Sequence, residues 1–186
     1  MTDVTQWRRI ANIGALAGLM LWSGAAFGAA PGRGAEGKQA VARTADPSAK
    51  MSFVPPSGWS RDSHAPAPNI IFVAPDEPPG SVNIGVVSEL VGHPTLAQVV
   101  QANRDFAAHT PGLTIYEEHA AMLAGEKAHM WRMHVRPPKG EAHEIRQVFC
   151  MRNRRSYILT LAGLPSNIHK YEGAFDKVVA SFAWTK

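Results

Sequence analysis

Alternating apolar and polar residues, interrupted by Pro- and Gly-rich stretches, predict a chain rich in β-strands. Residues 75–80 (Pro-Asp-Glu-Pro-Pro-Gly) are typical of a loop, and residues 123–125, 137–140 and 153–155 are typical of turns. The strands expected between these breaks are residues 69–74, 81–90, 113–121, 126–136, a segment ending at 152, and 156–162. The last four follow one another through short turns, which predicts an antiparallel meander.

Two further segments carry apolar residues at helical spacing. The first begins after Thr95, which can cap a helix, and Gln98 three residues later completes a capping box. Residues 110–112 (Thr-Pro-Gly) end this helix. A closing helix is expected over residues 166–182. Its apolar face consists of Ile168, Tyr171, Phe175, Val178, Val179 and Phe182.

Side-chain matching predicts the register of the last two hairpins. We expect Trp131 opposite Ile145 and Phe149 opposite Leu159, because a slip of one residue exchanges the two faces of a strand. The resulting face consists of Trp131, Ile145, Phe149, Met151, Tyr157, Leu159 and Leu161. The closing helix is expected to cover this face, so the predicted fold class is α+β: an antiparallel β-sheet meander with helices packed on it.

Residues 1–29 have the three parts of a secretory signal peptide. Arg8 and Arg9 precede an uncharged stretch over 10–32, and small residues allow cleavage after Gly28 or Ala29. This predicts an exported protein, periplasmic or secreted. About 20 apolar residues also suffice to span a bilayer, so an uncleaved membrane anchor is the alternative. A lipid anchor is excluded, because the cleavage site has no cysteine.

The remaining chain divides into a leader, residues 30–50, and a folded domain, residues 51–186. The leader combines Gly, Ala and charged residues without an apolar period, which is typical of a flexible segment. The net charge of +4 comes from dispersed residues and does not indicate nucleic-acid binding. The single cysteine, Cys150, cannot form an intramolecular disulfide. We interpret it as a core residue, with a reactive thiol as the alternative.

Four short motifs resemble, in their order along the chain, the PsbP-like group of α/β sandwich proteins. They are Phe-Val-Pro-Pro-Ser-Gly-Trp at 53–59, Val-Asn-Ile at 82–84, Ser-Tyr-Ile-Leu-Thr at 156–160, and Tyr171 through Phe175 to Ser181-Phe182. The resemblance covers residues 51–186. This group contains photosystem accessory proteins, exported bacterial proteins of the DcrB type and mycobacterial lipoproteins, so the resemblance implies a non-enzymatic accessory or binding role.

The candidate binding residues are one aromatic side chain and one basic cluster. Trp59 follows a Pro-rich stretch, where an exposed ring can serve as a ligand platform, and core packing is the alternative. Arg152, Arg154 and Arg155 gather at a hairpin tip and are candidates for contact with an acidic partner or lipid headgroups. The alternative is a solvated tip, which is commonly polar.

The eight histidines are dispersed, and no two of them have the i, i+4 spacing of a helical zinc motif. We therefore expect no metal site, no cofactor and no catalytic residues. The predicted function is an exported, non-catalytic accessory or binding protein of the cell envelope. We expect a protein or another envelope component as its partner, no nucleic acid, and membrane contact only through an uncleaved N-terminus. The alternative is an envelope enzyme, a hydrolase or a metal-dependent one, with a site built from scattered loop residues such as His64, His93 and Glu118.

Overall fold

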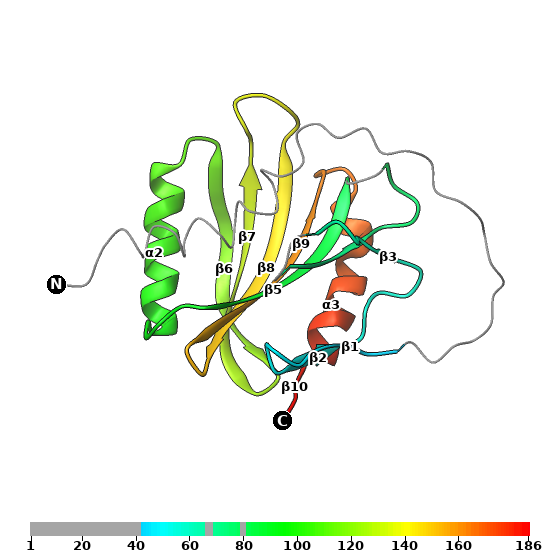
Figure 1. Cartoon of the computed structure of the whole chain (residues 1–186). Helices are drawn as coiled ribbons and strands as arrows, with labels where there is room; N and C mark the ends of the chain where they lie inside the picture. Colours follow the sequence, from blue (N-terminus) through cyan, green and yellow to red (C-terminus); the bar gives the residue numbers. More distant parts are fainter. Residues whose placement is uncertain (1–41, 66–68, 79–80) are drawn as a thin grey trace.

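The computed structural model describes residues 42–65, 69–78 and 81–186, which form two antiparallel sheets with helices packed against them (Figure 1). The larger sheet has seven strands in the order β3-β4-β5-β9-β8-β7-β6. They are β3 (Ser60–Arg61), β4 (Ile70–Val73), β5 (Val82–Leu90), β9 (Arg155–Gly163), β8 (His143–Arg152), β7 (Glu126–Val135) and β6 (Leu113–Leu123). The smaller sheet has the order β1-β2-β10, with β1 (Thr44–Asp46), β2 (Met51–Phe53) and β10 (Ala183–Trp184). The α+β class predicted from the sequence is confirmed.

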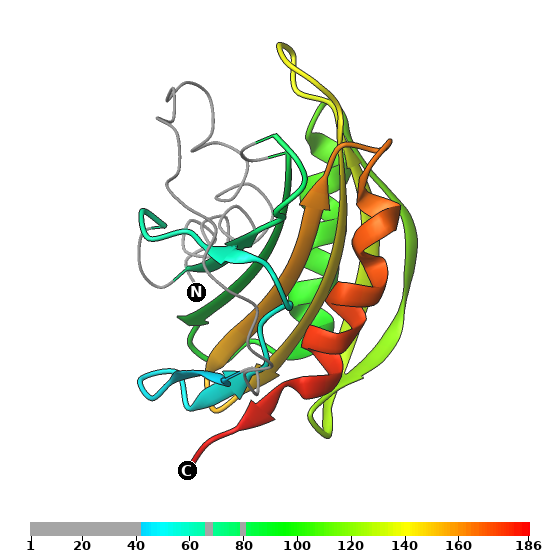
Figure 2. The ribbon, with the colours of Figure 1, turned by 90° about the vertical axis from the view of Figure 1, so that its right-hand side faces the viewer.

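Helices lie on opposite faces of the larger sheet: in Figure 2, α3 (Glu172–Ser181) lies in front of the sheet and α2 (Leu96–His109) behind it. Each helix covers its own apolar cluster. Below α2 the cluster includes Val99, Val100, Trp131, Met133, Ile145 and Phe149. Below α3 it includes Val148, Leu159, Leu161, Phe175, Val178 and Phe182. In the described part of the chain, no helix is both long and apolar enough to cross a membrane.

The start of α2 has the capping box that the sequence predicts. The backbone N–H of Gln98 donates to Thr95 Oγ1 at 3.2 Å, and the backbone N–H of Thr95 donates to Gln98 Oε1 at 2.8 Å. The closing helix differs from its prediction. A 3-10 turn, η1 (Ile168–Tyr171), comes first, and α3 begins at Glu172 without a side-chain cap. The apolar face of this segment still packs on the sheet through Ile168 and Phe175.

The predicted register of the β7–β8 hairpin is wrong by two residues. Trp131 lies opposite Gln147 rather than Ile145, and Met133 takes the place opposite Ile145. The reason is the polar end of the indole ring. Trp131 Nε1 donates to Gln147 Oε1 at 2.8 Å, and both side chains are buried. A buried indole N–H needs an acceptor, and the apolar match with Ile145 supplies none.

The predicted register of the β8–β9 hairpin is wrong by one residue, so that Phe149 lies opposite Ile158 rather than Leu159. The connection is a two-residue turn, Asn153-Arg154, with φ values of 50° and 64° that are typical of a type I′ turn. A slip of one residue exchanges the faces of a strand. The predicted single apolar face is therefore divided. Trp131, Ile145, Phe149 and Met151 belong to the α2 side, and Tyr157, Leu159 and Leu161 belong to the α3 side.

The folded part of the chain begins upstream of Met51, within the expected leader. Strand β1 pairs with β2, and Ala49 is only 1% exposed. Tyr157 Oη donates to the carbonyl of Ala49 at 2.8 Å, and Arg43 Nη2 donates to the carbonyl of Ser181 at 2.6 Å. The expected signal peptide (1–29) and residues 30–41 of the leader lie outside the described residues.

The Asn153-Arg154 turn gives a test of the observed register. Arg154 is exposed and has a φ of 64°, a conformation that costs a residue with a Cβ atom about 1 kcal/mol. We expect Arg154→Gly to raise the free energy of unfolding by about 1 kcal/mol, measured by urea denaturation. Arg154→Ala is the control, because it removes the same side chain and keeps the Cβ. An equal gain from both variants contradicts the type I′ turn.

Candidate functional site

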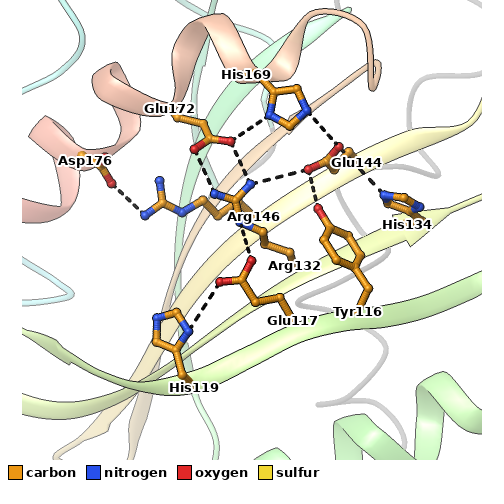
Figure 3. Close-up of polar contacts among 10 residues, drawn as sticks. All are labelled: Tyr116, Glu117, His119, Arg132, His134, Glu144, Arg146, His169, Glu172 and Asp176. Carbon is orange, nitrogen blue, oxygen red and sulfur yellow. Dashed lines mark hydrogen bonds and ion pairs between the residues drawn. The ribbon is translucent and has the colours of Figure 1, made fainter.

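Charged and polar side chains gather where η1 and α3 lie against β6, β7 and β8 (Figure 3). We call this group the polar cluster. It consists of Tyr116, Glu117, His119, Arg132, His134, Glu144, Arg146, His169, Glu172 and Asp176. Strand alternation explains its position. Trp131 and Met133 face α2, so Arg132 and His134 point to the α3 side of the same strand.

Arg132 is the centre of the polar cluster. Its Nη1 and Nη2 donate to the two carboxylate oxygens of Glu172 at 2.8 and 2.9 Å, a bidentate pair that joins β7 to the start of α3. Its Nε lies 3.2 Å from Glu117, and its Nη1 lies 3.6 Å from Glu144. The hydrogen bonds from Arg132 lower the pKa of Glu172 to about 2. The carboxylates around Arg132, Glu172 first, raise the pKa of its guanidinium.

Glu144 is the most enclosed carboxylate of the polar cluster, with a side chain only 4% exposed. Tyr116 Oη donates to its Oε1 at 2.5 Å. Burial of this hydroxyl and its bond to Glu144 raise the pKa of Tyr116 to about 12, although the residue as a whole is 46% exposed. Two imidazoles lie at the other oxygen of Glu144, His169 Nε2 at 3.7 Å and His134 Nε2 at 3.9 Å.

Arg146 is the cross-strand neighbour of Arg132, so two guanidinium groups lie side by side on adjacent strands. Like charges opposite each other destabilise a sheet unless each has a partner. Arg146 Nη2 lies 2.8 Å from Asp176 on α3, and its guanidinium lies 5.3 Å from the centre of the Phe175 ring. Each arginine therefore binds a different carboxylate of α3, and the two pairs hold this helix against the sheet.

Two members of the polar cluster, Glu172 and Tyr116, keep one protonation state near neutral pH and serve to hold elements together. Glu172, with a pKa of about 2, stays ionised, and Tyr116, with a pKa of about 12, stays protonated. Efficient general acids and bases have pKa values near the working pH. Within residues 42–65, 69–78 and 81–186, no three His, Cys, Asp or Glu side chains are arranged to hold a metal ion.

Trp59, which the sequence suggested as an exposed platform, is only partly exposed. It is partly buried against the core, and its ring contacts Tyr171 edge to face at 5.3 Å. The turn before it explains this position. Gly58 has a φ of 80°, and the backbone N–H of Trp59 donates to the carbonyl of Pro56 at 3.3 Å, which turns the chain back toward η1. Part of the ring therefore packs on the core, and ligand binding at its remaining surface stays a prediction.

The three arginines at the β8–β9 hairpin do not point to a common site. Arg152 lies 4.4 Å from the centre of the Trp184 ring and 3.4 Å from Glu126. Arg155 donates to Ser88 Oγ on β5 at 3.4 Å. Arg154 is exposed at the turn itself. The hairpin tip therefore presents one outward arginine, and binding to an acidic partner there stays a prediction.

The residues named for the enzymatic alternative come from three different elements. His64 lies in the β3–β4 connection, 3.6 Å from Asp62, and His93 lies in the connection between β5 and α2. Glu118 on β6 binds Arg104 of α2 and Nε2 of His129, each at 3.0 Å. Burial opposes the shift, but the hydrogen bonds from Arg104 and His129 lower the pKa of Glu118. Glu118 thus holds α2 to the edge of the sheet.

Sequence reasoning missed Tyr116, Arg132, Glu144 and Glu172 as a group. These residues lie on four different elements and approach one another only in the correct register and with α3 docked. The one local signal is the alternation of polar and apolar residues along β7 and along β8. It marks which side chains share a face, but not which element covers that face.

No protein-family model matches this chain, and no curated protein matches it by sequence. Solved structures do match its fold. Cyanobacterial PsbP (CyanoP) from Synechocystis aligns with a TM-score of 0.59 and 15% identity, over 82% of this chain and 98% of its own. LpqN of Mycobacterium tuberculosis, described as involved in cell envelope biogenesis, aligns with a TM-score of 0.52 and 18% identity, over 80% and 87%. PA94 of Pseudomonas aeruginosa, of unknown function, gives 0.52 and 20%, over 73% and 90%. The chain has the PsbP-like fold.

Glu172 makes the stability of the domain depend on pH. Its pKa in the folded protein, about 2, lies below the ordinary value of 4.5, so its contribution is complete above pH 4.5 and is lost as the pH falls toward 2. After allowance for screening at a side chain 27% exposed, we expect Glu172→Gln to lower the free energy of unfolding by about 1–2 kcal/mol at pH 7. Urea denaturation at pH 7, 4 and 3 measures the difference, which should shrink between pH 4 and pH 3.

Asp176→Asn is the matched control, because it removes a carboxylate from the same helix that is 58% exposed and bonded to Arg146. We expect its effect at pH 7 to be the smaller of the two, since exposed ion pairs contribute little. An equal loss from both variants, or a Glu172→Gln loss that does not change with pH, contradicts the central place of the Arg132–Glu172 pair.

Proposed function

We propose that this chain is an exported, non-catalytic accessory protein of the cell envelope that binds a protein or another envelope component. The observation that carries the proposal is the mutual pairing of the polar cluster. Its charges, of which Glu144 is buried and Arg132 and Arg146 are partly buried, pair with one another across β6, β7, β8 and α3, which is an arrangement for fixing a fold. The function of such a domain then lies in the surface that the fold presents.

The likeness to solved structures supports the envelope setting. LpqN is described as involved in cell envelope biogenesis, and the chain shares its fold at 18% identity. Identity at this level transfers the fold and not the partner. We therefore propose only an accessory or binding role in the envelope. The chemistry of the partner is inferred from the surface of this domain and not from similarity.

Export rests on the sequence. Arg8 and Arg9, the uncharged stretch that follows and the small residues before Pro31 together support a signal peptide. An exported domain folds where thiols are readily oxidised. The thiol of Cys150 is buried, and burial raises its pKa to about 12, which keeps it protonated and unreactive at neutral pH.

We expect export of the full chain in a bacterial host to remove the signal peptide after Gly28 or Ala29. The measurement is the intact mass of protein with a C-terminal affinity tag, purified from the periplasmic fraction. Arg8→Glu with Arg9→Glu is the matched variant, since an acidic start prevents export. A chain of full mass in the membrane fraction supports the uncleaved anchor and contradicts removal of the signal.

We expect chemical crosslinking of the exported chain in intact cells to give a discrete partner adduct, because an accessory protein acts through contact. Mass spectrometry identifies the partner, and the tagged chain held in the cytoplasm is the control. The purified mature chain is tested in parallel against hydrolase substrates, with and without divalent transition metals. Turnover that His64→Ala or Glu118→Gln abolishes contradicts the non-catalytic role and favours the enzymatic alternative.

A further inference from the structure

Strand β6 is the outermost strand of the larger sheet and pairs only with β7 (Figure 2, light green at the right-hand border). Most of its side chains between Thr114 and Met122 are exposed or partly exposed. In the described chain, no strand pairs with its outer edge. The outer edge of a terminal strand carries backbone N–H and C=O groups that are free to pair with another extended chain.

A groove of about 430 Å³ adjoins this edge, between β6 and α2. Its α2 wall consists of Arg104, Ala107 and Ala108, and its other wall consists of residues 113–118. The groove exists because α2 presents two small side chains here, where larger ones would fill the space. A strand edge beside a helix, with room for side chains between them, is the geometry by which domains bind an extended peptide as an added strand.

A β-bulge divides β6 into two parts. The register with β7 shifts between Ile115 and Glu117, and Tyr116 is the extra residue. A bulge interrupts the regular edge along which a long strand could otherwise pair with any extended chain. On both sides of the bulge β6 pairs regularly with β7. Residues 113–118, which line the groove, span the bulge, so an added strand that reaches the groove pairs on its N-terminal side as well as at Glu117 and Glu118.

The acidic residues of β6 favour a different partner over a second copy of this chain. The exposed acids of β6, Glu117 and Glu118, are adjacent at its middle. Antiparallel pairing of two copies about this point brings their carboxylates together, which destabilises the contact. Glu117 is 47% exposed and carries one oxygen near Arg132 and the other near His119. Both of its oxygens are engaged, and Glu118 is engaged by Arg104 and His129, so a cationic side chain of a partner joins these pairs from the exposed side of Glu117.

We propose that the edge of β6 and the adjoining groove bind an extended basic segment of a partner protein, which adds to the sheet as a further strand. This inference rests on the accessory role proposed above and names the chemistry of its partner. Side chains of an added strand alternate between the two faces. One set enters the groove beside Ala107 and Ala108 and is small and apolar. The other set lies on the side of Glu117 and is basic.

The probe is a ten-residue peptide of alternating Lys and Val with a fluorescent label, titrated into the full mature chain. We expect saturable binding with chemical-shift changes at the backbone amides of residues 114–123. A Glu-Val peptide of the same length should bind at least ten-fold more weakly, because its carboxylates lie on the side of Glu117. A Lys-Val peptide N-methylated at all of its amides should lose binding, since neither of its edges can donate hydrogen bonds to β6.

Ala108→Trp is the central variant, because Ala108 is exposed and lines the groove. We expect it to weaken Lys-Val binding roughly ten-fold, the effect of filling the space that the Val side chains use. Gln101→Trp adds the same ring to an exposed position of α2 outside the groove lining and should leave the affinity unchanged. Ala108→Lys, which repels the basic peptide, serves if the tryptophan variant misfolds.

Three results overturn the proposal: no binding of the Lys-Val peptide at millimolar concentration, equal binding of the N-methylated peptide, or shifts confined to another surface. The crosslinking experiment separates this proposal from the accessory role. A partner adduct that persists in Ala108→Trp leaves the accessory role standing and overturns the groove as its site. Loss of the adduct in Ala108→Trp and not in Gln101→Trp supports both.

Discussion

Two linked hydrogen bonds across three central strands, one buried and one partly buried, constrain the rest of the structure. Gln147 on β8 accepts the indole N–H of Trp131 on β7 at 2.8 Å and donates to Thr160 Oγ1 on β9 at 3.0 Å. Moving β7 by one residue removes Gln147 from the indole and leaves a buried donor unpaired, at a cost of about 1–3 kcal/mol. With Trp131 held on the α2 side, its neighbour Arg132 must face α3. The position of the polar cluster follows from this constraint.

Much of the fold was predictable, because its signals are local. The capping box at Thr95, the breaks between strands and the helical spacing before Phe182 each depend on residues close together in the sequence. The register was not predictable by apolar matching, since that method gives no weight to the indole N–H of Trp131. The stretch Asn153-Arg154-Arg155 also allows either a two-residue or a three-residue turn. Only the positive φ values of Asn153 and Arg154 show that the turn has two residues.

The candidate site was harder to predict than the fold, because it joins distant elements. Trp59 and the hairpin arginines attract attention as single residues, yet Trp59 packs on Tyr171, and Arg152 packs on Trp184. Arg132 and Glu172 stand out in no local pattern, and their pairing requires both the β7–β8 register and the docking of α3. A paired charge of this kind often contributes more to a unique arrangement than to net stability. Here the Arg132–Glu172 pair holds the first residue of α3 on the sheet.

The bulge at Tyr116 links the polar cluster to the edge of the sheet. One inserted residue in β6 turns the Tyr116 ring to the α3 side, where its hydroxyl reaches Glu144. The same insertion interrupts the regular edge of β6 beside the groove. Glu117 and Glu118 follow the bulge directly and point to opposite faces: Glu117 reaches Arg132, and Glu118 reaches Arg104 of α2. The contacts that hold both helices in place therefore also set the charge of the strand edge and the width of the groove beside it. Replacing Glu118 would therefore change the charge of the edge and also remove a contact that holds α2 on the sheet.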